Sequence, residues 1–344
     1  METTPIHLPY LPAVDKLSFR RPASDRDADA LAALHARRAA RDAVDPLSIV
    51  GNQGLPTAEV MRSALVQAEA EQCLDHWLVA EVGGQVVGCS VIESWHEADG
   101  RWVYLTRVWV LPEWRGHPIG QALLRWGENE ASRLVAVEHP GEPLELAGVA
   151  SSTEPELADW LLQAGYTVGN TELEMELDPS ATIREYLLPA GIELRPALPE
   201  HILPIAESIA EAYRGEFPGD RFRNTHSEVA GQAEWYSHPI HDRALWKIAW
   251  HEQQVAGQVL PLILRGGGVV DRAVIDEVSV RPAWRRQGLA RALLTQALID
   301  LRSRGLAVIR LTTGAEFRTR ARDLYTSLGF RVVKEFPSYR KTMG

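Results

Sequence analysis

The feature that most constrains the fold of this chain is an internal repeat at an offset of 170 positions. Residues 108–124 read VWVLPEWRGHPIGQALL and residues 278–294 read VSVRPAWRRQGLARALL, with eight of 17 aligned positions identical. Three further landmarks recur in the same order: an Arg-Pro-Ala start at 21 and 195, the related segments 78–88 and 247–257, and a Gly-aromatic pair at 165 and 329. A repeat of this length indicates a tandem duplication of a domain of ordinary size.

The second copy has the pattern of an α/β domain. Apolar residues at Ile202, Ile205, Ile209 and Ala212 share one face of a helix predicted over 199–213. Strands of a hairpin are predicted over 245–250 and 255–264. The other predicted strands are 192–195, 274–280, 307–312 and 330–335, and the other predicted helices are 226–235, 288–304 and 319–328. This mixed order predicts an α/β fold with a mixed sheet, in two domains at 14–180 and 190–344.

Composition restricts the classes of function. The 344 residues include 45% hydrophobic and 24% charged residues, which is typical of a soluble globular protein. The net charge of −10 disfavours nucleic-acid partners and mildly favours cationic ones, although an acidic surface also serves solubility alone. Cys73 and Cys89 are too few for a disulfide framework, lack a metal-binding spacing and are interpreted as buried apolar residues. The N-terminus does not read as a signal peptide and no stretch approaches the ~20 apolar residues of a membrane span, so we expect a cytoplasmic location.

The most specific chemical motif lies where a predicted strand turns into a helix. Residues 285–290 read Arg-Arg-Gln-Gly-Leu-Ala, which has the form Q/R-x-x-G-x-G/A. Small residues let the backbone approach a ligand without a Cβ in the way. The unpaired N–H groups of a new helix then point at one spot with positive potential. The motif therefore predicts a turn that binds a pyrophosphate.

This strand, turn and helix resemble motif A of the GCN5-related N-acetyltransferase superfamily. About 40 residues later, ARDLYTSLGF at 321–330 resembles the family's A-x-x-L-Y-x-x-L-G-F pattern. The resemblance covers both copies, and the tandem arrangement with LWKIAWHEQQVAGQV at 245–259 resembles the mycothiol-synthase-type acetyltransferases. It implies two tandem GNAT-like domains, each with a mixed, mostly antiparallel central sheet flanked by helices. It also implies acetyl-CoA as cosubstrate and no metal.

The resemblance assigns roles to individual residues. Tyr325 matches the family's tyrosine that protonates the coenzyme A thiolate, although such a residue also packs a helix against a sheet. Val278 and Val280 would pair with the pantetheine arm, and the N–H of Val280 is a candidate oxyanion donor, an effect worth ~3 kcal/mol in acyl transfer. The residues expected to bind the pyrophosphate are Arg285, Arg286, Gln287, Gly288, Leu289, Ala290 and Arg291.

The general base is expected among carboxylates near the cofactor-binding strand. Alternation along a strand sends Asp276 and Glu277 to opposite faces. Asp276 goes with Val278 and Val280, which look like core, so the hypothesis is that Glu277 takes the amine proton, directly or through a water. The alternative is a surface or capping carboxylate, and Glu316 is a weaker candidate.

The acceptor site of the family lies under the first two helices and their loop, which here reads RGEFPGDRFRN. Glu211, Glu216 and Asp220 would suit a cationic amine, although a solvated loop explains them equally well. The aromatic residues that would wall the site, or belong to the core instead, are Trp235, Tyr236 and Trp246.

The first copy departs from the motif at three points. Pro118 stands at the position of Gly288 and lacks the N–H that would face the pyrophosphate. A hydrogen bond to a charged group is worth roughly 1.5 to 3 kcal/mol. Leu161 aligns with Tyr325, and residues 106–108 carry no carboxylate. The N-terminal domain is therefore predicted to be degenerate and structural, and the C-terminal domain catalytic. The second copy departs less: Arg286 and Arg318 stand where the family often has glycine and asparagine.

Taken with the resemblance, these motifs predict an acetyl-CoA-dependent N-acetyltransferase that moves the acetyl group directly to a primary amine of a small molecule, in a monomer or homodimer. Two alternatives stay open: a non-catalytic acyl-CoA-binding regulatory protein, and a protein or peptide N-acetyltransferase. Retention of Tyr325 and of the turn at 285–290 argues against the first. The sequence does not decide between a small-molecule and a peptide acceptor.

Overall fold

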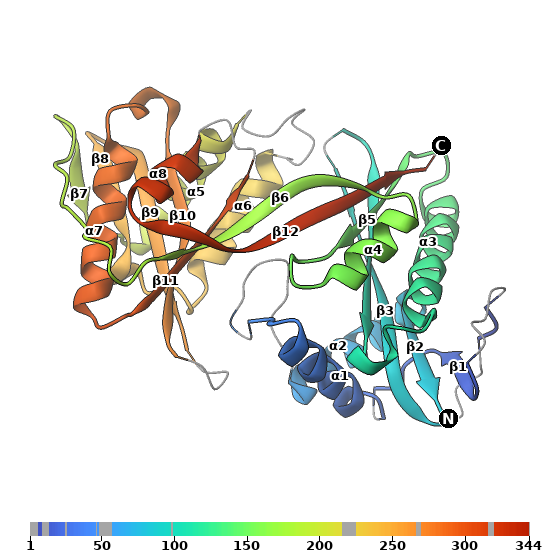
Figure 1. Ribbon diagram of the computed structural model, residues 1–344. Coiled ribbons are helices and arrows are strands. Elements are labelled where there is room, and N and C mark those ends of the chain that lie inside the picture. The colour runs from blue at the N-terminus through green and yellow to red at the C-terminus, as the bar shows by residue number, and fades with distance from the viewer. Residues whose placement is uncertain are drawn as a thin grey trace. The chain divides into compact units, whose positions relative to one another are not determined.

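The computed structural model describes residues 6–8, 14–24, 26–45, 47, 57–97, 99–214, 225–265, 270–315 and 320–343. By packing, the chain divides into two compact units (Figure 1). Unit 1 comprises Met1–His96, Gly100–Thr171 and Phe336–Gly344, and unit 2 comprises Glu97–Asp99 and Glu172–Glu335. The predicted domains at 14–180 and 190–344 follow the repeat in the sequence, whereas the units assign residues 172–180 to the second unit and 336–344 to the first.

Unit 1 is a sheet of antiparallel pairs and one parallel pair, with helices packed against it. Its strands follow the order β1-β2-β3-β4-β5-β12, and only β4 and β5 run parallel. Helices α1 and α3 pack on β3 and β4. The bounds are β1 Leu17–Arg20, α1 Ala28–Arg41, α2 Ala58–Ala70, β2 Trp77–Val82, β3 Gln85–His96, β4 Trp102–Val110, α3 Ile119–Glu138, β5 Leu144–Val149, α4 Pro155–Gln163 and β6 Thr167–Leu177.

Unit 2 repeats this architecture. Its strands follow the order β6-β11-β10-β9-β8-β7, and the parallel pair is β10 with β11. The bounds are β7 Glu193–Arg195, α5 Ile202–Tyr213, α6 Thr225–Ser237, β8 Lys247–His251, β9 Gln254–Leu264, β10 Arg272–Val280, α7 Leu289–Ser303, β11 Val308–Gly314, α8 Ala321–Ser327 and β12 Phe330–Thr342. Every element predicted for the second copy is present, and the expected α/β fold with a mixed, mostly antiparallel sheet is confirmed.

Strand β12 is longer than predicted, and it changes unit along its length. Its first half, from Phe330, belongs to unit 2, while Ser338–Thr342 pairs with β5 inside unit 1. Tyr339 in that segment is part of the buried core of unit 1. In the other direction, the second half of β6 pairs with β11 inside unit 2. Each unit is therefore completed by a strand that the sequence repeat assigns to the other copy.

The cores explain why the predicted helices form. In α5, Ile202, Ile205 and Ile209 are buried at the helical spacing that the sequence predicted. Fully buried leucines and alanines line one side of α7, which packs on β9 and β10. Within the described part of the chain, no helix has both the length and the apolar character needed to cross a membrane.

Candidate active site

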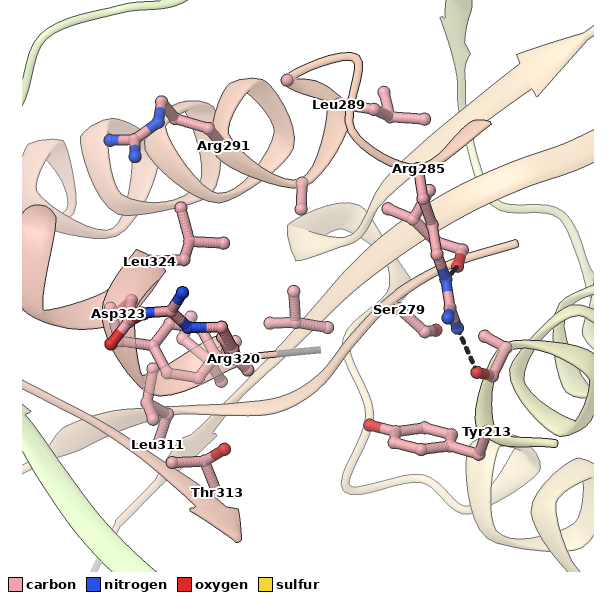
Figure 2. Close-up of a pocket in the computed structure, with 18 of the residues that line it drawn as sticks. Tyr213, Ser279, Arg285, Leu289, Arg291, Leu311, Thr313, Arg320, Asp323 and Leu324 are labelled. Carbon is pink, nitrogen blue, oxygen red and sulfur yellow. Dashed lines mark hydrogen bonds and ion pairs between the residues drawn. The ribbon is translucent and has the colours of Figure 1, made fainter. Parts of the chain in front are cut away.

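A cavity of about 980 Å³ opens in unit 2 between β10, β11 and the N-terminus of α7. Figure 2 shows Tyr213, Ser279 and Arg285 on one side of it and Leu324, Arg320 and Asp323 on the other. Nine of the eleven residues predicted for the site line this cavity: Val278, Val280, Arg285, Arg286, Gly288, Leu289, Ala290, Arg291 and Tyr325. Glu277 and Gln287 do not.

The turn before α7 has the geometry expected of an anion cradle. Gly288 is the N-cap residue with φ 84°, a left-handed conformation that side chains other than glycine rarely adopt. A Cβ at this position would meet no atom of the described residues within 4 Å, so glycine is required by the backbone angle and the space before it is open. No side chain in the described structure caps α7. Its first N–H groups therefore face the cavity as donors.

Arg285 braces this turn. Its Nε donates to the carbonyl oxygen of Val280 at 3.0 Å, and its Nη2 donates to the carbonyl oxygen of Ala212. The guanidinium thus joins the end of β10 to the end of α5 while its side chain lines the cavity. Arg286, where the family often has glycine, adopts φ 63°. Arg286 thus adopts the left-handed backbone conformation that glycine favours, and its Cβ makes this conformation strained.

A bulge in β10 lies at the carboxylate that faces the cavity. Ile275 pairs with Pro261 of β9, and Glu277 pairs with Leu260, so Asp276 is an extra residue in the ladder. Pro261 has no N–H for that ladder, and proline inside a sheet is found at such irregularities. The matching strands of unit 1, β3 and β4, carry Ile92 at the position of Pro261 and pair without a shift. The grouping of Asp276 with Val278 and Val280 nevertheless holds, since all three residues line the cavity.

Asp276 lines the cavity, contrary to the expectation that it belongs to the core. Its Oδ2 accepts a hydrogen bond from Trp235 Nε1 at 3.0 Å, and Tyr236 donates a second one. Burial raises the pKa of Asp276, while the two hydrogen bonds and the charge of His241 act in the opposite direction. The net effect is a carboxyl group whose pKa lies above the usual range of aspartate.

Glu277 is 8% exposed and lies outside the cavity lining. Its negative charge acts on the phenol of Tyr325 and on Tyr236. Burial, with Glu277 as a second cause, raises the pKa of Tyr325, so this phenol keeps its proton at neutral pH. Tyr325 therefore has the protonation state that an acid needs. The role of Glu277 as base stays a prediction.

A buried polar chain that the sequence did not predict reaches the cavity from behind β10. Ser208 Oγ on α5 donates to Gln258 Oε1 at 2.8 Å, and Gln258 Nε2 donates to Ser279 Oγ at 2.5 Å. Since its oxygen accepts from Gln258, the hydroxyl proton of Ser279 remains available as a donor, and Ser279 lines the cavity. The only signal in the sequence was a glutamine inside an apolar strand, which is costly to bury without a partner.

The other acceptor-side residues divide into two groups. Tyr236 and Trp246 are buried, whereas Trp235 is exposed. Glu216, Asp220, Glu316 and Arg318 lie outside the described residues.

No group of three or more His, Cys, Asp or Glu side chains suited to a metal ion occurs in the part of the chain that the structure describes.

The corresponding positions of unit 1 are filled by side chains. A Cβ on Gly120, which aligns with Ala290, would lie 2.2 Å from the ring of Trp160. Arg38 and Glu154 form a buried ion pair at 2.5 Å. Arg115 repeats the brace of Arg285, since its Nε donates to the carbonyl oxygen of Val110 at 3.3 Å.

The helix start of unit 1 also differs. Pro118 is the N-cap residue of α3 with φ −73°, so this turn lacks the left-handed residue found at Gly288. Leu161 stands at the position of Tyr325, and its buried apolar side chain supplies no acid. These features are those expected of a degenerate first copy, and its structural role stays a prediction.

Comparison with known proteins identifies both copies. Residues 206–330 match the Acetyltransferase (GNAT) family, and residues 74–155 match the Acetyltransferase (GNAT) domain. The mycothiol acetyltransferase of Thermobifida fusca (strain YX) is 26% identical over 270 residues, covering 74% of this chain and 78% of that protein. The [Ribosomal protein bS18]-alanine N-acetyltransferase of Escherichia coli (strain K12) is 42% identical over 62 residues, which are 18% of this chain and 41% of that enzyme. The chain thus spans less than half of the length of this second relative.

Solved structures share the tandem fold. A GCN5-related N-acetyltransferase from Sphaerobacter thermophilus superposes with a TM-score of 0.69 at 21% identity, covering 96% of both chains. A tandem GNAT protein from the clavulanic acid biosynthesis pathway gives a TM-score of 0.63 at 16% identity, covering 95% of this chain and 99% of that one. Both copies of the repeat are GNAT domains, and the chain belongs to the GCN5-related N-acetyltransferase superfamily as a tandem member.

Proposed function

We propose that unit 2 transfers an acetyl group from acetyl-CoA to a primary amine of a small molecule. The observation that carries the proposal is the single cavity lined by Gly288 and its neighbours, by the end of β10 and by Tyr325. In a GNAT domain, a turn with open space before a left-handed glycine and an uncapped helix suits a pyrophosphate. The bound thioester would supply an activated acetyl group.

We place the chemistry on Asp276, Tyr325 and the backbone of β10. Asp276, which lines the cavity, takes a proton from the ammonium form of the acceptor. The neutral amine then forms its bond to the thioester carbonyl carbon as the carbon–sulfur bond breaks. Tyr325 donates its proton to the departing sulfur, and the proton released by the new amide nitrogen restores the phenol.

Two donors are available for the carbonyl oxygen. The N–H of Val280 was expected in this role, and the hydroxyl of Ser279 adds a second candidate. Preorganised donors of this kind are worth ~3 kcal/mol each in acyl transfer. The buried Gln258 and Ser208 hold the Ser279 hydroxyl in place, so this donor requires no reorganisation during the reaction.

Glu277 remains the alternative base. It is buried and does not line the cavity, so it would act through a water molecule or through Tyr236. Asp276 is preferred because it lines the cavity itself. We further propose that the reaction takes place in the cytoplasm, the location expected from the sequence.

A peptide acceptor is the second candidate, because the bS18-alanine N-acetyltransferase, which acts on a ribosomal protein alanine, is a relative over 62 residues.

A thiol-release assay distinguishes acetyl transfer to a small amine from acetyl transfer to a peptide. Acetyl-CoA is incubated with the chain and either a panel of small amines or a peptide with an N-terminal alanine. We expect thiol release with members of the amine panel above the peptide rate. Release with the peptide alone would favour the second candidate, and release with neither, despite binding of acetyl-CoA, would indicate a regulatory acyl-CoA-binding protein.

A further inference from the structure

One buried hydroxyl group faces the cavity without a hydrogen-bond partner. It belongs to Thr313 on β11, which lines the cavity and is only 3% exposed. Figure 2 shows its hydroxyl oxygen turned toward the side of the cavity on which Tyr213 lies. Among the described residues, the Oγ1 atom of Thr313 has no partner. Such a group is costly to bury, because it has given up its hydrogen bonds to water.

The other buried serine and threonine hydroxyls in the described part of unit 2 are bonded. Ser208 and Ser279 are joined through Gln258. Thr295 donates to backbone carbonyl oxygens of its own helix, α7, at 2.9 and 3.1 Å. Thr313 is therefore the exception, and it lies in the wall of the cavity. A polar group of a bound molecule would be the partner that the described chain does not supply.

The packing of the strand does not explain this hydroxyl. In unit 1, β5 pairs with β4 in the same register as β11 with β10, and this register places Val149 at the position of Thr313. Valine and threonine have nearly the same shape, and both are β-branched residues that favour strands. The strand thus forms equally well with a methyl group in place of the hydroxyl. Binding of a ligand is the remaining reason for a threonine in unit 2.

The two strands beside the cavity indicate which part of a ligand meets Thr313. The parallel pairing of β10 with β11 ends at Ile275 and Leu311, and Asp276 and Thr313 line the cavity one and two residues later. Pairing of β11 with β6 continues to Gly314, so the backbone of Thr313 stays fixed. The proposed reaction brings the amine of the acceptor to Asp276. Because paired strands are about 4.8 Å apart, a group only a few bonds from that amine reaches Thr313.

We propose that Thr313 binds a hydroxyl group on the carbon beside the one that carries the amine, so that the preferred acceptor is a 1,2-amino alcohol and not a simple alkylamine. The inference rests on the proposed function, since it names the acceptor class of the same cavity. A threonine hydroxyl both donates and accepts, as does the hydroxyl of an amino alcohol, so the two groups match in either direction. An alkylamine of the same size leaves Thr313 without a partner and is disfavoured for that reason.

The test compares two amines of equal size on the enzyme loaded with coenzyme A, which has no acetyl group to transfer. 2-Aminoethanol and propylamine are both cationic at neutral pH, and they differ only by a hydroxyl in place of a methyl group. Calorimetry measures the affinity for each amine. We expect 2-aminoethanol to bind at least about fivefold more tightly, which is the effect of one additional hydrogen bond.

Thr313→Val removes the hydroxyl and keeps the shape of the side chain. It should bring the two affinities together and leave the affinity for coenzyme A unchanged. Thermal unfolding should show a variant at least as stable as the parent, because an unpartnered buried hydroxyl has been removed. Thr313→Ser keeps the hydroxyl and should retain the preference. The matched control is Thr326→Val, the same change at an exposed threonine of unit 2 that does not line the cavity, and it should leave the preference unaltered.

Three results would overturn the role of Thr313: equal affinities of the parent for the two amines, binding of neither amine, or an unaltered preference in a folded Thr313→Val enzyme. A loss of affinity for coenzyme A in Thr313→Val would also overturn it, since the hydroxyl would then contact the cofactor. Failure of coenzyme A to bind to the parent would refute the proposed function and the inference with it, so the two failures are distinguishable.

Discussion

At the scale of single residues, two protons have to move in the proposed reaction, and the site holds one group suited to each. The pKa of the Tyr325 phenol is raised by burial and by Glu277, so its proton is available for the sulfur. The pKa of Asp276 is raised by burial as well, above the usual range of aspartate, and its ionised form is the one that accepts a proton. The acid is thus a phenol and the base a carboxylate, and burial brings the pKa of the base, Asp276, nearer to neutrality.

Replacing Tyr325 by phenylalanine removes the acid and keeps the ring. General acid catalysis typically contributes 10²- to 10⁴-fold, so kcat should fall by about two orders of magnitude. The affinity for acetyl-CoA should change little, since the ring still lines the cavity. Steady-state kinetics and calorimetry check the two parts separately. The matched control is Tyr339→Phe, a buried tyrosine of unit 1, and unchanged turnover in Tyr325→Phe would remove this residue from its role.

The pH dependence of the rate should report Asp276. Because the base must be ionised, kcat/KM falls as the pH drops through the folded pKa, and this acidic limb should lie above the usual range of aspartate. In Asp276→Asn, the kcat/KM that remains should no longer decrease over this acidic pH range.

Stability gives an independent check of the same group. A raised pKa favours the protonated form in the fold, so this contribution is fully present below the unfolded pKa and is lost as the pH rises through the folded pKa. Asp276→Asn should therefore be at least as stable as the parent at neutral pH, and thermal unfolding measures this. A neutral-pH loss of stability would show that the carboxylate has a cationic partner.

At the scale of elements, the sequence predicted the strands and helices of unit 2 well because each carries its own periodic pattern. The turn at Gly288 was predictable for the same reason, since the requirement for glycine is local. The bulge was not, because it depends on Pro261 in a neighbouring strand. Alternation did group Asp276 with Val278 and Val280, but their face was interpreted as core, whereas all three line the cavity. The Ser208–Gln258–Ser279 chain joins three elements and left no contiguous pattern in the sequence.

Pro261→Val tests whether the proline maintains the bulge. Valine restores an N–H and is β-branched like Ile92, which stands at the matching position of unit 1, where the pairing is regular. We expect the regular ladder to turn Asp276 away from Trp235, with kcat lowered about tenfold or more and binding of acetyl-CoA nearly unchanged. A crystal structure of the variant with an intact bulge and full activity would refute this role of Pro261.

At the scale of the whole molecule, the repeat predicted two copies but not the exchange of their last strands. The sequence of one copy does not reveal this exchange, because β6 and β12 have the pattern of an ordinary strand whichever strand they pair with. The consequence is that the end of the chain, from Phe336, stabilises unit 1. Its contacts there include the buried Tyr339 and an ion pair of Lys341 with Glu128 at 2.9 Å.

A chain that ends at Phe336 should therefore lose stability in unit 1, although the deletion lies in the second copy. Removal of a buried aromatic side chain alone costs ~3 to 5 kcal/mol. Hydrogen exchange should show reduced protection in β4 and β5, with protection in β9 and β10 retained. The opposite pattern, with unit 2 losing protection first, would contradict the strand assignment.

The central claim is that coenzyme A binds at the turn before α7 and that unit 1 provides no second site. Titration calorimetry with acetyl-CoA tests it most directly, on the parent chain, on Gly288→Pro and on Pro118→Gly. The account predicts one equivalent per chain, a loss of at least about tenfold in affinity for Gly288→Pro, and no added equivalent in Pro118→Gly, because Trp160 and the Arg38–Glu154 pair still fill that region. Two equivalents in the parent, or full affinity in Gly288→Pro, would contradict it.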